Sequence, residues 1–377
     1  MNFDLEPEHE LIRDTVRQFA LEKVAPVAEE LDREKRFPYE LVAELAELGL
    51  MGMTIPEEYG GAGADTLSYA IVVEELTRID SSVAITLAAH HSLGTLPIWY
   101  FGNDEQKREW LPELASGQKL AAFGLTEAEA GSDAGATRTT ARLEDGEWVI
   151  DGSKIFITNA GTDITACVTI TAVTGAGEIS NIVVPNGTAG YVISEPMQKL
   201  GWHASDTREL SFQGARVPEG NLLGPRGAGF QQFMRILDGG RISVAAMGVG
   251  LAQGCYDLAV AYAKERKQFG KPISKFQAVQ AKLVDMATEL ELARALVWKA
   301  AWEKDQGRAF AKTAAMAKLY SGELSHRAAN WALQIHGGYG FMDEYAISRL
   351  YRDQKILEIG EGTNEVQRMV IAKHLGL

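Results

Sequence analysis

The segment TTARLEDGEWVI, residues 139–150, decides the fold class of this chain. Apolar side chains alternate with polar ones at Ala141 and Leu143, and the alternation resumes at Trp148 and Ile150. A period of two residues is typical of a half-buried strand, and the Asp-Gly pair between the two halves is a strong hairpin signal. A β-hairpin is therefore expected here.

The sequence on both sides of this hairpin changes from strand-like to helix-like periodicity. Further strands are expected at residues 154–158, 166–172, 181–184, 191–194 and 208–212. Helical spacing of apolar residues predicts helices at 8–26, 41–49, 66–78, 82–101, 104–115, 229–267, 274–304 and 309–335. The expected fold is a multidomain α+β protein with a helical domain (1–120), a β-domain (121–228) and a helical bundle (229–377).

Composition excludes several classes of function. A chain of 377 residues with 46% hydrophobic residues suits an ordinary globular protein with a large core. Its net charge of −14 argues against binding to nucleic acid, because such binding needs clustered Lys and Arg. The two cysteines form no metal-binding pattern, the adjacent His90 and His91 make a poor chelate, and no metal is expected.

The sequence also argues against export and against a membrane span. The acidic N-terminus lacks the features of a signal peptide. The most apolar helical stretch, residues 242–260, is interrupted by Ser243, Gln253 and Asp257, which favours a buried helix. We therefore expect a cytoplasmic protein.

A carboxylate between two glycines stands out near the C-terminus, in the segment LEIGEGTNE at residues 357–365. Apolar residues at helical spacing precede and follow this segment. Glycine leaves the backbone free and the space beside it open, so Glu361 is positioned to reach into a cleft. An exposed surface turn is the alternative.

Two motifs suggest a site for a planar, anionic cofactor. The segment FGLTEAEAGSD, residues 123–133, places Gly131 and Ser132 where backbone N–H groups and a hydroxyl can meet an anion, although an ordinary interdomain loop has the same composition. In the strand KIFITN, residues 154–159, Phe156 and Thr158 share one face and suit a flat ring and its polar edge. A simple core strand is the alternative there.

Three further motifs lie in the C-terminal helices. The segment RKQFGKP, residues 266–272, ends a helix with cations that suit either the helix dipole or a phosphate. The segment QIHGGYG, residues 334–340, has more glycines than a helix cap needs. The pair Gly239-Gly240 inside the first long helix costs about 1 kcal/mol per glycine relative to alanine, so it requires a packing or ligand reason.

Together these motifs resemble those of the acyl-CoA dehydrogenases, along essentially the whole chain and in the same order. In detail the chain is most similar to the short-chain, butyryl-CoA type. The resemblance implies a helical domain, a β-barrel-like middle domain and a C-terminal four-helix bundle, which enclose FAD and an acyl-CoA thioester of fatty acid β-oxidation. Many family members have Trp where this chain has Phe156, which implies a smaller stacking surface here.

The resemblance also implies roles for individual residues. The residues implied to contact FAD are Phe123, Leu125, Thr126, Gly131, Ser132, Phe156, Ile157, Thr158, Arg266, Gln268, Phe269, Gln277, Gln334, Ile335, Gly337, Gly338, Thr363, Asn364 and Glu365. In the family, some of these residues, around Arg266, Gln277 and 334–338, contact the FAD bound to a neighbouring subunit. This implies a homo-oligomer, usually a tetramer. The residues implied to contact the substrate are Ser132, Asp238, Arg241 and Gly362.

Glu361 matches the catalytic base of the family. It would take the α-proton while the β-hydrogen passes as hydride to the flavin N5, and an electron-transfer flavoprotein would then take the electrons. Some branches carry the base on the long helix instead, and that position here is Gly240, which has no side chain. The alternatives are an O₂-using oxidase on the same fold and a non-catalytic binding relative. The acyl group stays open, including ω-carboxyl groups with Arg208 or His91 as partners.

Overall fold

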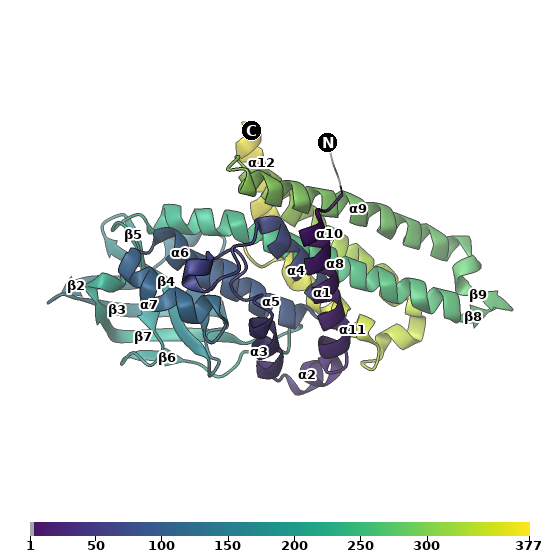
Figure 1. Ribbon diagram of the computed structural model, residues 1–377, viewed down its shortest axis with the longest axis horizontal. Helices are drawn as coiled ribbons and strands as arrows, with labels where there is room; N and C mark the ends of the chain where they lie inside the picture. Colours follow the sequence, from purple (N-terminus) through teal and green to yellow (C-terminus); the bar gives the residue numbers. More distant parts are fainter. Residues whose placement is uncertain (1–3) are drawn as a thin grey trace.

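The computed structural model describes residues 4–377, and it arranges them as a helical part, a sheet and a second helical part (Figure 1). The helices of the N-terminal part are α1 (Pro7–Phe19), α2 (Ala28–Glu34), α3 (Tyr39–Glu47), α4 (Thr66–Thr77), α5 (Ser81–Ala89), α6 (Leu96–Phe101) and α7 (Asp104–Ala115). Side-chain caps start three of them: Asp65 accepts from Ser68 N, Asp80 accepts from Val83 N, and Asn103 forms a capping box.

The single helix expected at residues 82–101 is wrong in one respect, because a π-helix at His90–Thr95 separates α5 from α6. The backbone of the sheet approaches this segment closely. A Cβ on Gly94 would lie 2.2 Å from the carbonyl oxygen of Ala121, and Ala121 N donates to His90 Nδ1 at 3.1 Å. The irregular turn therefore joins the helical part to the sheet.

The middle part is a mixed sheet in the order β1-β4-β2-β3-β7-β6, with β5 paired to β4. Its strands are β1 (Leu120–Gly124), β2 (Thr140–Glu144), β3 (Glu147–Thr158), β4 (Thr165–Gly175), β5 (Glu178–Pro185), β6 (Tyr191–Ile193) and β7 (Thr207–Pro218). The predicted hairpin is confirmed, since β2 and β3 pair antiparallel up to Glu144 and Glu147. Among the described strands no recorded pairing joins the two ends of the sheet, so the expected barrel-like closure is not confirmed.

The C-terminal part is built on α8, which runs from the sheet to the far end of the molecule (Figure 1). Its elements are α8 (Gly229–Glu265), β8 (Lys267–Gln268), β9 (Lys271–Pro272), α9 (Gln277–Asp305), α10 (Ala311–His336), α11 (Ala346–Asp353) and α12 (Asn364–Leu375). The structure confirms the helical C-terminal part, whereas the four-helix count and the domain boundaries at 120/121 and 228/229 remain predictions.

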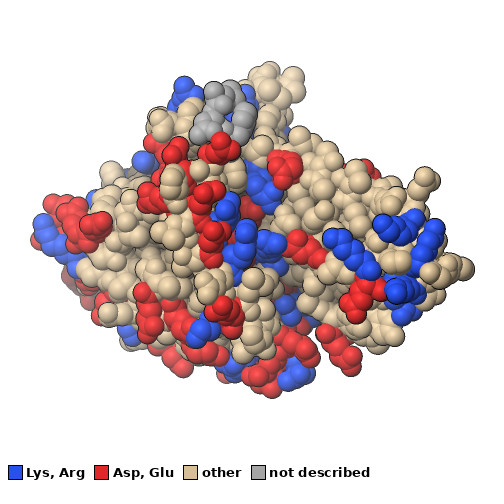
Figure 2. Space-filling model, turned by 45° about the vertical axis from the view of Figure 1, so that its right-hand side comes forward, with Lys and Arg blue, Asp and Glu red and all other residues tan. Residues whose placement is uncertain are grey.

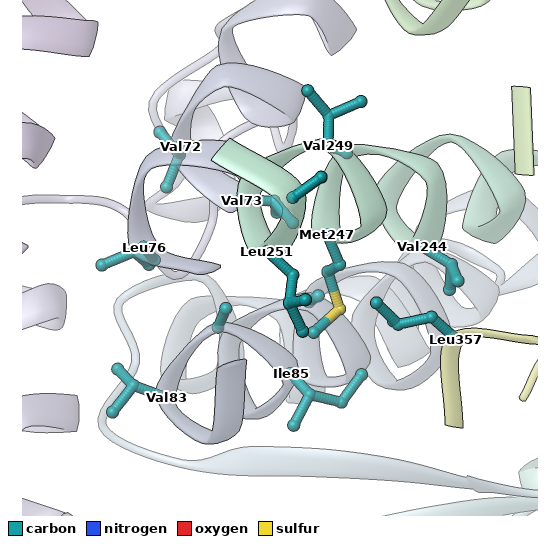
Figure 3. Packing of buried hydrophobic residues seen from close by; sticks show 14 of the residues in the cluster. Val72, Val73, Leu76, Val83, Ile85, Val244, Met247, Val249, Leu251 and Leu357 are labelled. Atoms are coloured by element: carbon teal, nitrogen blue, oxygen red, sulfur yellow. The ribbon is translucent and has the colours of Figure 1, made fainter. Parts of the chain in front are cut away.

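The largest core surrounds α8. Figure 3 shows Met247 and Leu251 of α8 beside Ile85 of α5 and Leu357, with residues of α4 on the other side. By length and composition α8 is able to cross a membrane, but 67% of its most apolar window is buried within the protein. The apolar run is thus accounted for by the core, as the sequence indicated.

Hydrogen bonds tie the sheet to both helical parts. Asn159, at the end of β3, donates from Nδ2 to the carbonyl oxygen of Thr86 on α5 at 2.8 Å. The buried Asp353 at the end of α11 accepts from Trp202 N at 2.7 Å and from the Ser81 hydroxyl at 2.6 Å. These bonds fix β3, α5 and α11 relative to one another.

Candidate active site

Glu361 lies in a tight turn between two helical segments. A 3₁₀-helix at Gln354–Glu358 ends before it, and α12 begins after it with Thr363 as the N-cap, whose hydroxyl accepts from Val366 N. Glu361 has a φ of 52° and Gly362 a φ of 92°. A glutamate rarely adopts the left-handed region, so the surroundings hold the backbone where its side chain turns inward.

The carboxyl group of Glu361 lies against the bare backbone of Gly240 on α8. A Cβ at position 240 would lie 2.0 Å from Glu361 Oε2, far inside van der Waals contact. A side chain at position 240 would therefore displace the carboxyl group of Glu361 from this place. This contact is the packing reason for Gly240. Among the described residues, a Cβ on Gly239 would meet only Lys304 Nζ, at 3.5 Å.

Burial raises the pKa of Glu361 to about 7, and the positive charges of Lys318 and Arg241 oppose that rise. Oε2 is buried and has no hydrogen-bond partner among the described residues. Unpaired buried oxygens are costly and uncommon in native proteins. A carboxyl group with this pKa and a free oxygen is suited to exchange a proton near neutral pH.

Arg241 lies one residue beyond Gly240 and is 2% exposed. Its guanidinium group forms an ion pair with Asp238 one turn earlier, and its Nε has no partner among residues 4–377. The structure thus brings the two expected substrate-binding residues of α8 together beside Glu361. The buried, partly unpaired guanidinium group of Arg241 suits a polar group of a ligand.

The phenol of Tyr69 is close enough to Glu361 for their charges to interact, and Ser243 and Ser92 lie beside that phenol. Burial raises the pKa of the Tyr69 phenol, with smaller contributions from Ser243, Glu361 and Ser92. The donors are used within the protein: Tyr69 donates to Ala88 O at 3.1 Å, and the serines donate to carbonyl groups one turn back on their own helices. Within residues 4–377, the hydroxyl protons of Tyr69, Ser243 and Ser92 are therefore already used by carbonyl groups of the protein.

The expected cofactor loop follows β1 and lies beside the end of β3. Ile155 N donates to Thr126 O at 2.9 Å, and Lys154 Nζ donates to Leu125 O at 3.2 Å. Phe123 is buried at the end of β1, which sequence reasoning missed as a strand. The structure therefore brings the loop at 123–132 and the strand at 156–158 together, as expected.

A buried ion pair supports this loop. Lys154 Nζ lies 2.7 Å from Glu127 Oε1, and Glu127 also accepts from the backbone N–H groups of Arg138 and Thr139. Burial opposes ionisation of Glu127, but Lys154 and these hydrogen bonds lower its pKa to about 2. The Glu127 carboxylate thus ties the loop to β3 and to the segment just before β2. Neither residue was selected from the sequence.

The surface formed by this loop and β3 fits a flat, anionic cofactor. Phe156 is 61% exposed with a φ of 64°, at a β-bulge that turns its ring outward, while Ile157 is buried behind it. A Cβ on Gly131 would meet no atom of the described residues within 4 Å, and Ser132 is exposed beside it. The exposed ring of Phe156 could pack on a flat ring system, and the open backbone and hydroxyl at residues 131–132 could bind an anionic group such as a pyrophosphate.

The second group of expected cofactor residues lies at the opposite end of the molecule, near β8 and β9 (Figure 1). A cavity of about 540 Å³ there is lined by Arg266, Gln268, Ile335, Gly337 and Gly338, together with Tyr262, Ile273, His336, Tyr339 and Met342. Lys and Arg side chains gather at this end, on the right of Figure 2. One copy of the chain does not join this cavity to the loop at 123–132.

The remaining expected cofactor residues are spread around these two sites. Phe269 is 92% exposed in the β8–β9 turn. Gln277 and Gln334 are exposed but do not line the 540 Å³ cavity near β8 and β9, which is called the tip cavity below. Thr363, Asn364 and Glu365 form the first turn of α12 next to Glu361. Sequence reasoning overlooked Lys318, which is fully buried next to the Glu361 turn.

Comparisons with known proteins agree with this arrangement. Family models describe the N-terminal, middle and C-terminal domains of acyl-CoA dehydrogenases, and they match residues 6–118, 122–215 and 227–376. The probable acyl-CoA dehydrogenase YngJ of Bacillus subtilis is 52% identical over 100% of both chains. The short-chain specific acyl-CoA dehydrogenase of Clostridium acetobutylicum is 45% identical over 99% of both.

Solved structures show the same likeness. Butyryl-CoA dehydrogenase from Megasphaera elsdenii has a TM-score of 0.97 and 43% identity, with 100% of both chains covered. A chain solved in work on the electron transferring flavoprotein of Acidaminococcus fermentans has a TM-score of 0.97 and 43% identity over 100% of this chain and 99% of that one. Acyl-CoA dehydrogenase complexed with FAD from Bacillus anthracis has a TM-score of 0.94 and 36% identity over 99% and 67%.

The fold and the site thus define a flavin-dependent oxidoreductase with a helix–sheet–helix architecture. The chain belongs to the acyl-CoA dehydrogenase family, and its cofactor is FAD.

Proposed function

We propose that this protein catalyses the α,β-dehydrogenation of a short-chain acyl-CoA to the trans-2-enoyl-CoA, with Glu361 as the base that removes the α-proton. The observation that carries the proposal is the buried, unpartnered Oε2 of Glu361 pressed against Gly240. The short-chain substrate class is supported by the butyryl-CoA and short-chain relatives.

The site supplies more than a base. Removal of an α-proton beside a thioester builds negative charge on the carbonyl oxygen, and fixed donors must stabilise that charge. The backbone N–H of Glu361 has no recorded acceptor among the described residues, so it is available for this oxygen. Bound FAD supplies the acceptor for the β-hydride. Ionised Glu361 and its own N–H would then act on adjacent atoms of the same thioester.

The substrate proposal is restricted to acyl groups without a second charge. The closest cations, Lys318 and Arg241, bond to Gly362 and Asp238. His91 contacts Tyr69 and Thr54, and burial lowers its pKa to about 3, so it is neutral. Arg208 bonds to Asp206 and to two carbonyl groups beside the sheet. Neither residue proposed from the sequence is free to bind an ω-carboxylate.

We further propose that the tip cavity serves the FAD of a neighbouring copy in a homotetramer, and that an electron-transfer flavoprotein takes up the electrons. The separation of this cavity from the loop at 123–132 supports the first statement, and the relative from Acidaminococcus fermentans supports the second. A cytoplasmic location also remains a proposal.

The test is Glu361→Gln, combined with a panel of straight, branched and ω-carboxyl acyl-CoAs and an artificial electron acceptor. We expect the variant to keep FAD and to lose nearly all turnover, while the parent prefers short straight chains. Substantial turnover by Glu361→Gln would contradict the assignment of the base. Rapid oxidation of the reduced, product-bound flavin by air would instead favour an oxidase.

A further inference from the structure

Lys318 is a lysine of α10 whose side chain is fully buried beside the Glu361 turn. Burial of an ammonium group is costly unless the group is paired and hydrogen-bonded. The proposed reaction gives Lys318 no role, and its position in the middle of a core helix requires a reason.

The ammonium group of Lys318 bonds to the residues that follow Glu361. Nζ donates to the carbonyl oxygen of Gly362 at 2.8 Å and lies 3.4 Å from Asn364 Oδ1. Gln367 Nε2 donates to the same carbonyl oxygen at 2.9 Å. The carbonyl group of Gly362, in the peptide group between Gly362 and Thr363, therefore accepts from one charged donor and one neutral donor.

The backbone of α10 reaches this turn without intervening side chains. One turn after Lys318, a Cβ on Gly322 would lie 3.0 Å from Leu357 O and 3.5 Å from Asn364 Oδ1. Residues four apart share one face of a helix. Lys318 and Gly322 thus form one face that fits the segment from Leu357 to Asn364.

Several charged groups act on this pair. Burial lowers the pKa of Lys318 to about 8, against the attraction of Glu361, Glu358 and Glu365, and Arg241 lowers it further. Lys318 and Arg241 in turn favour the ionised form of Glu361. Tyr69, on the other side, is a neutral phenol whose pKa burial raises.

We propose that Lys318 is a positioning residue for the base: its hydrogen bond to Gly362 O holds the left-handed Glu361 turn, and its positive charge favours the carboxylate form of Glu361. The inference rests on the proposed role of Glu361. It assigns two separable contributions to one side chain, the position of the turn and the charge on the base.

Substitutions at two positions separate these contributions. Lys318→Met removes the charge and the hydrogen bond, Lys318→Gln removes the charge but keeps a donor, and Gln367→Leu removes only the neutral donor. Lys312→Met, at an exposed lysine of the same helix, is the control. The measurements are FAD content, thermal stability and the pH dependence of kcat/KM, with flavin bleaching by substrate followed in a stopped-flow instrument.

We expect both Lys318 variants to move the acidic limb of kcat/KM to higher pH by about 1 unit or more, because an opposite charge nearby shifts a carboxyl pKa by about 1–3 units. At pH 7 both should bleach the flavin at least about tenfold more slowly than the parent. Gln367→Leu should slow bleaching without moving the limb. Thermal stability of Lys318→Met should fall only together with this shift of the acidic limb, because the variant removes the hydrogen bond to Gly362 O along with the charge.

An unchanged acidic limb in Lys318→Gln, with bleaching within twofold of the parent, would overturn the proposal even if Lys318→Met fails to fold. A fall in stability without a shifted limb would also overturn it, because that is the behaviour of a structural residue. The variant Glu361→Gln distinguishes an error in the proposed function from an error in the role of Lys318. If that variant is inactive and Lys318 has no effect, only the role of Lys318 is wrong.

Discussion

The carboxylate of Glu361 occupies the place of the side chain that Gly240 lacks, since a Cβ at 240 would lie 2.0 Å from Glu361 Oε2. The base and the long helix are thus complementary in shape, and residue 240 controls where the base lies.

Gly240→Ala should displace the Glu361 carboxyl group and lower kcat/KM about a hundredfold, because displacement of a catalytic group by about 1 Å has effects of that size. The matched control is Gly239→Ala, where the new Cβ would meet only the flexible end of Lys304. The control should keep activity and gain up to about 1 kcal/mol in helix stability. Steady-state kinetics and thermal unfolding of both variants test the prediction, and equal activities would contradict it.

Activity should depend on the protonation of Glu361. With a pKa raised by burial to about 7, the carboxyl group is ionised above that pH and protonated below it. We therefore expect kcat/KM to fall as the pH drops below about 7, by a factor of ten for each unit at the limit. A profile that stays flat down to pH 5 would contradict the role of Glu361.

The same pKa predicts a dependence of stability on pH. Because the folded pKa lies above the usual value of 4.5, the folded state binds more protons between the two values, so stability falls as pH rises from about 4.5 to 7. Glu361→Gln removes this cost and should be more stable than the parent at pH 8, by on the order of 1–3 kcal/mol. At pH 4.5 the two proteins should unfold alike. Thermal unfolding at both pH values is the measurement.

Lys154→Met should weaken FAD binding by at least about tenfold, because it leaves Glu127 as an unpaired buried carboxylate and loosens the loop at 123–132. The exposed Lys312→Met serves as the control. Titration of the apoproteins with FAD, followed by flavin fluorescence, tests this prediction. Equal affinities would show that the ion pair stabilises the sheet alone.

Asp353→Ala should destabilise the protein by about 2–4 kcal/mol, because it leaves the buried donors Trp202 N and Ser81 Oγ without an acceptor. Glu113→Ala, which removes an exposed carboxylate on α7, is the control. Denaturant unfolding measures the difference. A loss below about 0.5 kcal/mol would mean that the contact between α11 and the sheet region is dispensable.

Residue patterns predicted the order of helices and strands because strands and amphipathic helices have distinct periods, as at Ala141 and Leu143. Strand β1 was not predicted because all five of its residues are buried, so its sequence shows no alternation of apolar and polar residues. The π-helix near Gly94 was not predicted because it depends on the close approach of Ala121, which is distant in the sequence.

The same contrast holds for the site. Glu361 was visible because glycines flank it, but its partnership with Gly240 required the three-dimensional structure to confirm the space. Lys318 resembles any surface lysine when only helical spacing is considered. The small residues around it, Ala315, Ala317 and Gly322, are the signal of close packing that identifies it as buried.

The length of α8 has a consequence for genetics. Gly240 lies beside the base of one site, whereas Arg266, just past the helix end, lies about 39 Å away along the axis and is proposed to serve a neighbour's FAD. A subunit with Glu361→Gln and a subunit with Arg266→Ala would each be defective alone. When the two subunits are coexpressed and form one oligomer, they should complement each other. Some active sites then combine an intact Glu361 from one subunit with an intact Arg266 from its neighbour.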